Sequence, residues 1–239
     1  MAVLEVVVSD HWPFLKSTRD IHVTDAEGAY LYTKDGPLLD AAGGAIVVNI
    51  GHGRQEVASA VGKATAQSSY VVPPWLTEER LALVERLRED WLPESLSRLH
   101  MTSGGSEAVE SAIKMAIMHH ASRGQPEKSQ IIGRSISYHG TTLATTAVGG
   151  HEARKVGIAH VLNSHPVIPT PYVLRCPDTE PLRYFVQELE KTIASEGSET
   201  IAALVADPVA VVVEHIARLC SAQVDQWVGV VAIARAAAV

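Results

Sequence analysis

Residues 102–110 bring hydroxyl side chains and two glycines together directly before a helical pattern. Five apolar residues then recur with the spacing of a buried helix face: Val109, Ala112, Ile113, Ala116 and Ile117. The first amides of a helix lack partners within it and carry the positive end of its dipole. Gly104 and Gly105 allow close approach to the backbone and Ser106 adds a hydroxyl, so the run predicts a phosphate-binding cup. The alternative is a Ser/Gly helix cap that binds no ligand.

A second segment, residues 131–143, reads as an apolar strand that ends in Tyr138, His139 and Gly140 and is followed by a pair of threonines. The ring of Tyr138 is suited to stacking on a flat ligand, and the alternative is a core aromatic at the end of the strand. His139 either orients a site or is an ordinary buried histidine. The residues alone leave both alternatives open.

Together the two segments resemble the class III aminotransferases, which are fold type I enzymes that use pyridoxal phosphate. In that family a Ser-Gly-Ser/Thr-Glu-Ala run opens the helix that holds the cofactor phosphate. An aromatic-His-Gly run follows the next strand and supplies the ring that stacks on the pyridine. The resemblance therefore implies a weak, non-covalent site for pyridoxal phosphate, formed by Gly104, Gly105, Ser106, Tyr138 and His139.

Other segments extend the resemblance, in the family's order, over about residues 10–209. They are the hairpin-like run at 27–40, the Gly-His-Gly at 51–53, Pro171-Tyr172 with Arg175-Cys176-Pro177, and the Ala-Asp-Pro-Val at 206–209. Asp207 ends an apolar strand, at the carboxyl edge where α/β sheets bind ligands, and is a further candidate for the cofactor site. The resemblance also implies an amino donor and a 2-oxo acid as substrates, and a homodimer with active sites at its interface.

The resemblance stops after residue 209. The family continues to a strand ending in Asp-Glu-Val, whose Asp pairs with the pyridine nitrogen, and then to the lysine that forms the Schiff base. No Asp-Glu-Val occurs here, and seven lysines are present: Lys16, Lys34, Lys63, Lys114, Lys128, Lys155 and Lys191. Because none matches the catalytic position, we expect the chain alone to be inactive. It resembles the first half of an aminotransferase with an unrelated tail.

Two other classes of function stay open. Gly104-Gly105-Ser106-Glu107-Ala108 approximates the nucleophile elbow of a serine hydrolase, and Asp207 and His215 follow in the hydrolase chain order. The elbow's last glycine is replaced by Ala108, however, and the elbow leaves Tyr138 unexplained. The other alternative is a non-catalytic relic that binds a cofactor or a partner chain.

Strand and helix signals alternate along the chain, which predicts an α/β fold with a mostly parallel sheet flanked by helices. By resemblance it is an incomplete fold type I large domain (55–209), preceded by a small-domain segment (1–54) and followed by a divergent tail (210–239). We expect a hairpin at 20–40, helices at 55–68, from Thr77, from the cup and at 182–196, and strands at 98–102, 131–137 and 201–207. Residues 166–181 read as a long Pro-rich connection.

Composition narrows the class of protein. The chain has 239 residues, is 46% hydrophobic and carries a formal net charge of −7, which favours a folded protein and argues against a nucleic-acid surface. The apolar start lacks a basic region and the Val/Ala-rich tail is interrupted by charges, so we expect a cytoplasmic protein that does not enter a membrane. Two cysteines make no disulfide framework, and no Cys/His spacing fits zinc, so no metal is expected.

Overall fold

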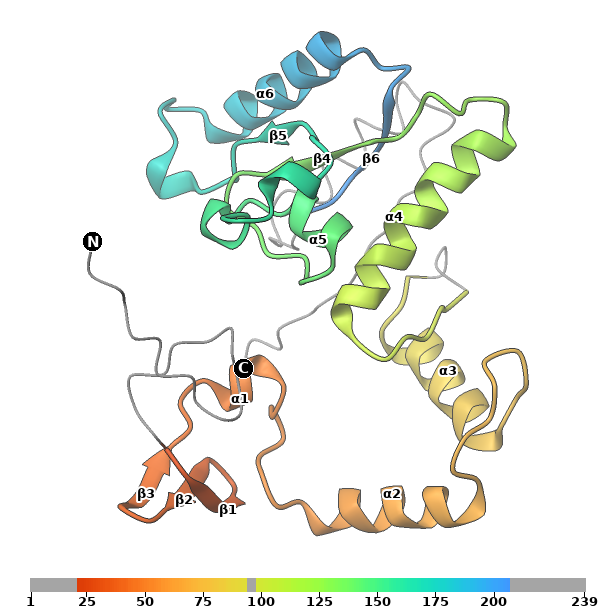
Figure 1. Ribbon diagram of the computed structural model, residues 1–239, viewed down its shortest axis with the longest axis vertical. Coiled ribbons are helices and arrows are strands. Elements are labelled where there is room, and N and C mark those ends of the chain that lie inside the picture. Colours follow the sequence, from red (N-terminus) through yellow and green to blue (C-terminus); the bar gives the residue numbers. More distant parts are fainter. Residues whose placement is uncertain (1–20, 94–97, 207–239) are drawn as a thin grey trace. The chain divides into compact units, whose positions relative to one another are not determined.

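The computed structural model describes residues 21–93 and 98–206 (Figure 1). The chain divides into two compact units, Met1–Leu81 and Ala82–Val239, and each is described here by itself. The predicted divisions at residues 54 and 209 stay predictions.

The first unit begins with a three-stranded antiparallel sheet. Its strands are β1 (Val23–Glu27), β2 (Tyr30–Thr33) and β3 (Gly36–Leu39), in the order β1-β2-β3. The predicted hairpin is therefore confirmed, and a third strand, β3, extends it. The Gly-His-Gly segment returns to this sheet: His52 and Gly28 exchange backbone hydrogen bonds of 2.8 and 3.1 Å, and His52 Nε2 donates to Asp40 Oδ2 at 2.9 Å.

Helices follow the sheet in the chain. They are the short α1 (Gly43–Ile46), α2 (Gln55–Gln67) and α3 (Glu78–Asp90), which runs across the division between the units. As predicted, Thr77 caps α3, because its Oγ1 accepts the amide of Arg80 at 3.2 Å. The Arg80 guanidinium donates to the carbonyls of Val71, Val72, Pro73 and Trp75, which fixes the preceding loop on the helix. No residue of α2 or α3 is buried.

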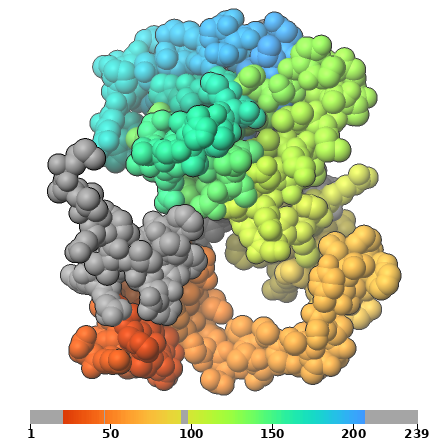
Figure 2. Space-filling view, viewed as in Figure 1, coloured from red at the N-terminus to blue at the C-terminus, as the bar shows by residue number. Residues whose placement is uncertain are grey.

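The second unit contains a parallel sheet of three strands in the order β5-β4-β6. The strands are β4 (Gln130–Arg134), β5 (Val167–Ile168) and β6 (Ile201–Leu204). The helices are α4 (Gly105–Ser122), α5 (Leu143–Val148) and α6 (Pro181–Glu196). Figure 1 shows α4 and α6 on either side of the strands, and Figure 2 shows the unit as a closely packed body. The predicted α/β class with a parallel sheet is confirmed.

The core lies on both faces of this sheet. On one face Ile131 of β4 packs with Ile113 and Ala116 of α4 and Val148 of α5. On the other face Ile132, Ile168 and Ile201 pack against apolar side chains of α6. Successive residues Ile131 and Ile132 thus point to opposite layers, as the alternation of a strand requires, and both are fully buried. This packing fixes α4 against β4 within the second unit.

The structure corrects several predicted elements. Residues 98–102 form no strand, and the strands predicted at 131–137 and 201–207 end earlier, at Arg134 and Leu204. The predicted connection at 166–181 contains β5 and the 3₁₀ helix η3 (Val173–Arg175). Four helical elements were not predicted: α1, α5 and the 3₁₀ helices η1 (Glu152–Arg154) and η2 (Ala159–Val161).

Candidate functional site

The start of α4 has the geometry expected of a phosphate cup. Gly104 is the residue before the helix, and its carbonyl accepts the first intrahelical bond, from the amide of Ala108 at 3.0 Å. The amides of residues 105–107 therefore precede the helical ladder. The carboxylate of Glu107 accepts the amide of Ser103 at 2.9 Å, which closes the loop leading into the helix. These bonds fix the direction of the first amides.

The Gly-Gly-Ser run at the start of α4 and the segment that follows Tyr138-His139-Gly140 meet at Ser106. The amide of Thr141 donates to Ser106 Oγ at 3.1 Å, and the two hydroxyl oxygens lie 3.5 Å apart. One turn further along α4, Glu110 Oε2 accepts the hydroxyl of Thr142 at 2.5 Å. Residues 35 positions apart in sequence are thus joined at the helix start.

Gly140 makes this junction possible. Its φ of +138° lies in the region that favours glycine, and it is buried. A Cβ at this position would lie 2.7 Å from Ser106 Oγ, 2.7 Å from Thr145 Oγ1 and 2.9 Å from the Cα of Ser106. Any side chain here would therefore push the second segment away from the cup.

Gly104 and Gly105 are different, because a Cβ on either would meet nothing within 4 Å. Both glycines are exposed and Ser106 is half-buried beside them. Packing within the described chain therefore does not require glycine at 104 or 105. Open backbone at a helix start is the form in which an anion can approach the amides.

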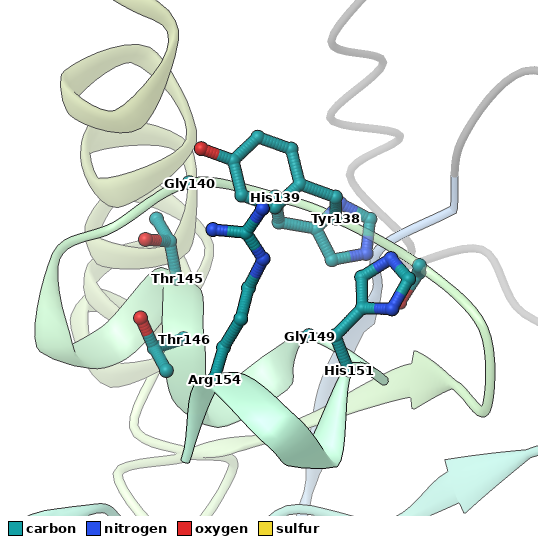
Figure 3. A pocket seen from close by; sticks show the side chains of 9 residues that line it. Tyr138, His139, Gly140, Thr145, Thr146, Gly149, His151 and Arg154 are labelled. Atoms are coloured by element: carbon teal, nitrogen blue, oxygen red, sulfur yellow. The ribbon is translucent and has the colours of Figure 1, made fainter. Parts of the chain in front are cut away.

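Gly140 also lines a small pocket (Figure 3). Its volume is about 190 Å³, including space open to solvent, and it is lined by Ser137, Tyr138, His139, Gly140, Thr145, Thr146, Gly149, His151 and Arg154. Tyr138 is 48% exposed, so it is not the core aromatic of the alternative interpretation. The Cζ of Arg154 lies 4.6 Å from the centroid of the Tyr138 ring, a cation–π contact on one face. His139 lines the same pocket and is 7% exposed.

Sequence reasoning missed Arg154 and Thr145. Arg154 lies in η1, 16 positions after Tyr138, and no spacing links the two before the chain is folded. Thr145 is fully buried. Its hydroxyl hydrogen bonds to the hydroxyl of Thr142 at 2.9 Å and to the carbonyl of Thr142 at 3.0 Å. The one sequence feature that pointed to this region was the Thr pair at 141–142, because both threonines hydrogen bond to side chains of α4.

Asp207 and His215 lie outside the described residues, so the predicted place of Asp207 in the cofactor site and the proposed hydrolase triad stay predictions. Within the described ranges, Ser106 Oγ hydrogen bonds to Thr141 and to no histidine. No lysine lines the pocket beside Tyr138. In the same part of the chain, no cluster of three His, Cys, Asp or Glu side chains could hold a metal ion, and no helix is long and apolar enough to cross a membrane.

Comparison with known proteins identifies the family. The family model of the class III aminotransferases matches residues 15–212. The chain belongs to this family. It is 33% identical over 192 residues to the uncharacterized aminotransferase YodT of Bacillus subtilis, a match that covers 78% of this chain and 43% of YodT. It is 31% identical over 204 residues to a putrescine–pyruvate aminotransferase of Pseudomonas aeruginosa, covering 78% of this chain and 42% of that enzyme.

Solved structures agree with this assignment. An (S)-enantioselective omega-transaminase from Thermomicrobium roseum has a TM-score of 0.77 at 31% identity, over 85% of this chain and 48% of that one. An amine transaminase from an uncultivated Pseudomonas species, in its pyridoxal-phosphate-bound form, has a TM-score of 0.78 at 26% identity, over 90% of this chain and 54% of that one. The chain thus has part of the fold type I architecture and spans about half the length of these relatives.

Proposed function

We propose that the described residues form the phosphate- and ring-binding part of a pyridoxal-phosphate-dependent aminotransferase. Its reaction is transfer of an amino group from an amine or amino acid to a 2-oxo acid. The observation that carries the proposal is the junction of the cup with the Tyr-His-Gly segment, through Thr141 and Ser106 at 3.1 Å. It joins the proposed anion cup to the segment that carries the exposed ring of Tyr138.

The residues present fit the cofactor's chemistry. The amides at the start of α4 and the Ser106 hydroxyl are donors for a phosphate, and the openness at Gly104 and Gly105 leaves the approach clear. Tyr138 offers the ring face that Arg154 does not cover. When bound, pyridoxal phosphate supplies an electron sink for a carbanion at the amino-bearing carbon of the substrate. The role of these residues is to fix the cofactor's position and plane. Asp207 is proposed as a further member of the site.

We also propose that these 239 residues alone do not catalyse the reaction. The chemistry needs a lysine amine to hold the cofactor aldehyde and move the proton. Lys114 is exposed on α4, Lys155 pairs with Glu152 at 2.9 Å, and Lys191 pairs with Glu188 at 2.6 Å. None of these three lysines lines the pocket of Tyr138.

We further propose a cytoplasmic protein that forms a homodimer. Support for association comes from apolar side chains that the first unit leaves exposed, among them Val61 at 59% and Trp75 at 69%. Exposed apolar side chains mark interaction sites where they gather into a large patch. Light scattering tests the oligomeric state directly.

Titration of the chain with pyridoxal phosphate, followed by absorbance and by equilibrium dialysis, tests the proposed site. Ser106→Ala removes one donor to a charged phosphate, worth about 1.5–3 kcal/mol, and should weaken binding about tenfold or more. Ser122→Ala, at the other end of α4, removes a hydroxyl bonded to the carbonyl of His119 and should leave the affinity unchanged. Pyridoxal, which has no phosphate, should bind equally to the original chain and to Ser106→Ala.

Equal affinity of Ser106→Ala and the original chain for pyridoxal phosphate would refute the cup. Labelling of Ser106 by a fluorophosphonate would favour the hydrolase alternative instead.

A further inference from the structure

We propose that Glu110 is a positioning residue of the cup, which acts through Thr142 to hold the Ser106 hydroxyl in the orientation that binds a phosphate. This role rests on the proposed function and adds a residue to the support of its phosphate site. Glu110 itself does not touch the ligand. Its carboxylate holds the segment that follows Gly140, and that segment holds Ser106.

Two hydrogen bonds tie this segment to one face of α4. Glu110 and Ser106 lie four positions apart on the helix, so their side chains share that face. The Thr141 amide donates to Ser106 Oγ at 3.1 Å. The next residue, Thr142, donates its hydroxyl to Glu110 Oε2 at 2.5 Å. One bond alone would leave the segment free to pivot about Ser106, and the second bond, one turn further along the helix, fixes its direction.

The hydroxyl of Thr142 makes this bond in place of a local one. Thr142 is the residue before α5, where a threonine ordinarily turns its hydroxyl toward an amide of the first helical turn. Within the described residues its side chain makes no such capping bond. Instead it reaches α4, which lies beside α5 (Figure 1). A hydrogen bond to a carboxylate is roughly twice as strong as one between neutral groups, so the bond to Glu110 is the stronger alternative.

Burial strengthens the bond between Glu110 and Thr142. Both residues are half-buried, and the hydroxyl of the fully buried Thr145 lies 2.9 Å from the Thr142 hydroxyl. Because water has limited access, the bond is electrostatically stronger than it would be at the surface. The other glutamate near the helix start, Glu107, is exposed and accepts the Ser103 amide at 2.9 Å, so it holds the loop that leads into the helix instead.

The consequence for Ser106 concerns its single hydroxyl hydrogen. Ser106 Oγ accepts the Thr141 amide, and accepting that bond uses a lone pair and leaves the hydrogen available. The Thr141 hydroxyl lies 3.5 Å away, beyond the usual length of about 2.5–3.0 Å for a bond between hydroxyls. The Ser106 hydroxyl is therefore able to donate to a phosphate at the start of α4 as long as Thr141 stays in place.

Amide hydrogen exchange followed by NMR, together with ligand titration of the full chain, tests this role. Glu110→Ala should weaken the binding of both pyridoxal phosphate and inorganic phosphate about threefold or more, and it should speed exchange of the Thr141 amide. Pyridoxal, which has no phosphate, should bind equally to the variant and to the original chain. Glu110→Gln keeps an acceptor oxygen for the Thr142 hydroxyl, so it should recover most of the affinity and of the protection from exchange.

A double variant tests whether Glu110 acts through Thr142. Thr142→Val keeps the shape of the side chain but removes the hydroxyl, and it should repeat the loss seen in Glu110→Ala. Because both changes remove the same bond, the double variant should bind phosphate no more weakly than either single variant.

Glu188→Ala is the matched control. Glu188 is also a half-buried helix glutamate that bonds to a neighbouring side chain, Lys191 Nζ at 2.6 Å, but it lies on α6. Its substitution should leave the phosphate affinity and the exchange of the Thr141 amide unchanged.

Three results would overturn the role of Glu110: unchanged affinities for phosphate and pyridoxal phosphate in Glu110→Ala, an equal loss in Glu110→Gln, or additive losses in the double variant. Failure of the proposed function appears differently. An original chain that binds inorganic phosphate in a Glu110-dependent way but does not bind pyridoxal phosphate would refute the proposed function alone. An original chain that binds neither ligand would overturn both.

Discussion

Replacement of Gly140 by alanine should break the junction between the cup and the Tyr-His-Gly segment. The new Cβ would lie 2.7 Å from Ser106 Oγ and Thr145 Oγ1 and 2.9 Å from the Cα of Ser106. Overpacking of this kind costs about 1–3 kcal/mol, and a non-glycine residue held at φ +138° adds about 1–3 kcal/mol. We therefore expect Gly140→Ala to lower the free energy of unfolding by about 2–6 kcal/mol. It should also weaken pyridoxal phosphate binding, because Ser106 is displaced.

The assay is urea unfolding followed by circular dichroism, with Gly124→Ala as the control. Gly124 also has a positive φ, +77°, but a Cβ there would meet nothing within 4 Å. The control should therefore show only the backbone cost of about 1–2 kcal/mol and should keep its affinity for the cofactor. If Gly140→Ala were no less stable than Gly124→Ala, close contact between Gly140 and Ser106 would be disproved.

Two further predictions concern histidines. His120 is buried and its Nε2 donates to the carbonyl of Ala202 at 3.1 Å, so His120→Ala should cost about 2–4 kcal/mol in urea unfolding, whereas the neighbouring His119→Ala should cost under about 1 kcal/mol. The hydrogen bond from His52 lowers the pKa of Asp40 below 3.8. The ionised Asp40 therefore contributes to stability above about pH 4. This contribution is lost as the pH falls through the lowered pKa of Asp40 in the folded state. Asp40→Asn should remove that acid-side dependence from the thermal midpoint, and an unchanged profile would contradict the assignment.

The elements that could be predicted are those with a repeated signal. The apolar stripe of α4 is buried where its spacing placed it, at Ala112, Ile113 and Ala116, because one face of a long helix must be covered by the sheet. The core of β4 is a buried apolar pair between Gln130 and Arg134, and β6 is a buried apolar run that follows Thr200. At the site, the family resemblance implied that the cup and the aromatic segment belong to one site, and in the structure the amide of Thr141 donates to Ser106 Oγ.

What could not be predicted depends on partners far away in the chain. Residues 98–102 have strand-like composition but lie outside any ladder of the described sheet, and a strand exists only through its neighbour. β5 is two residues long and lies between Pro166 and Pro169, too short for any periodic pattern. Arg154 reaches Tyr138 only because η1 follows α5 back toward the end of β4, and no local pattern carries that information.

We propose that this chain holds pyridoxal phosphate by its phosphate and ring without a dedicated lysine. Borohydride reduction of the chain with bound pyridoxal phosphate, followed by peptide mass spectrometry, tests it most directly. We predict sparse labelling spread over several lysines, with binding that depends on Ser106. Stoichiometric labelling of one lysine among the seven would contradict the account, because it would show a catalytic amine positioned at the cup.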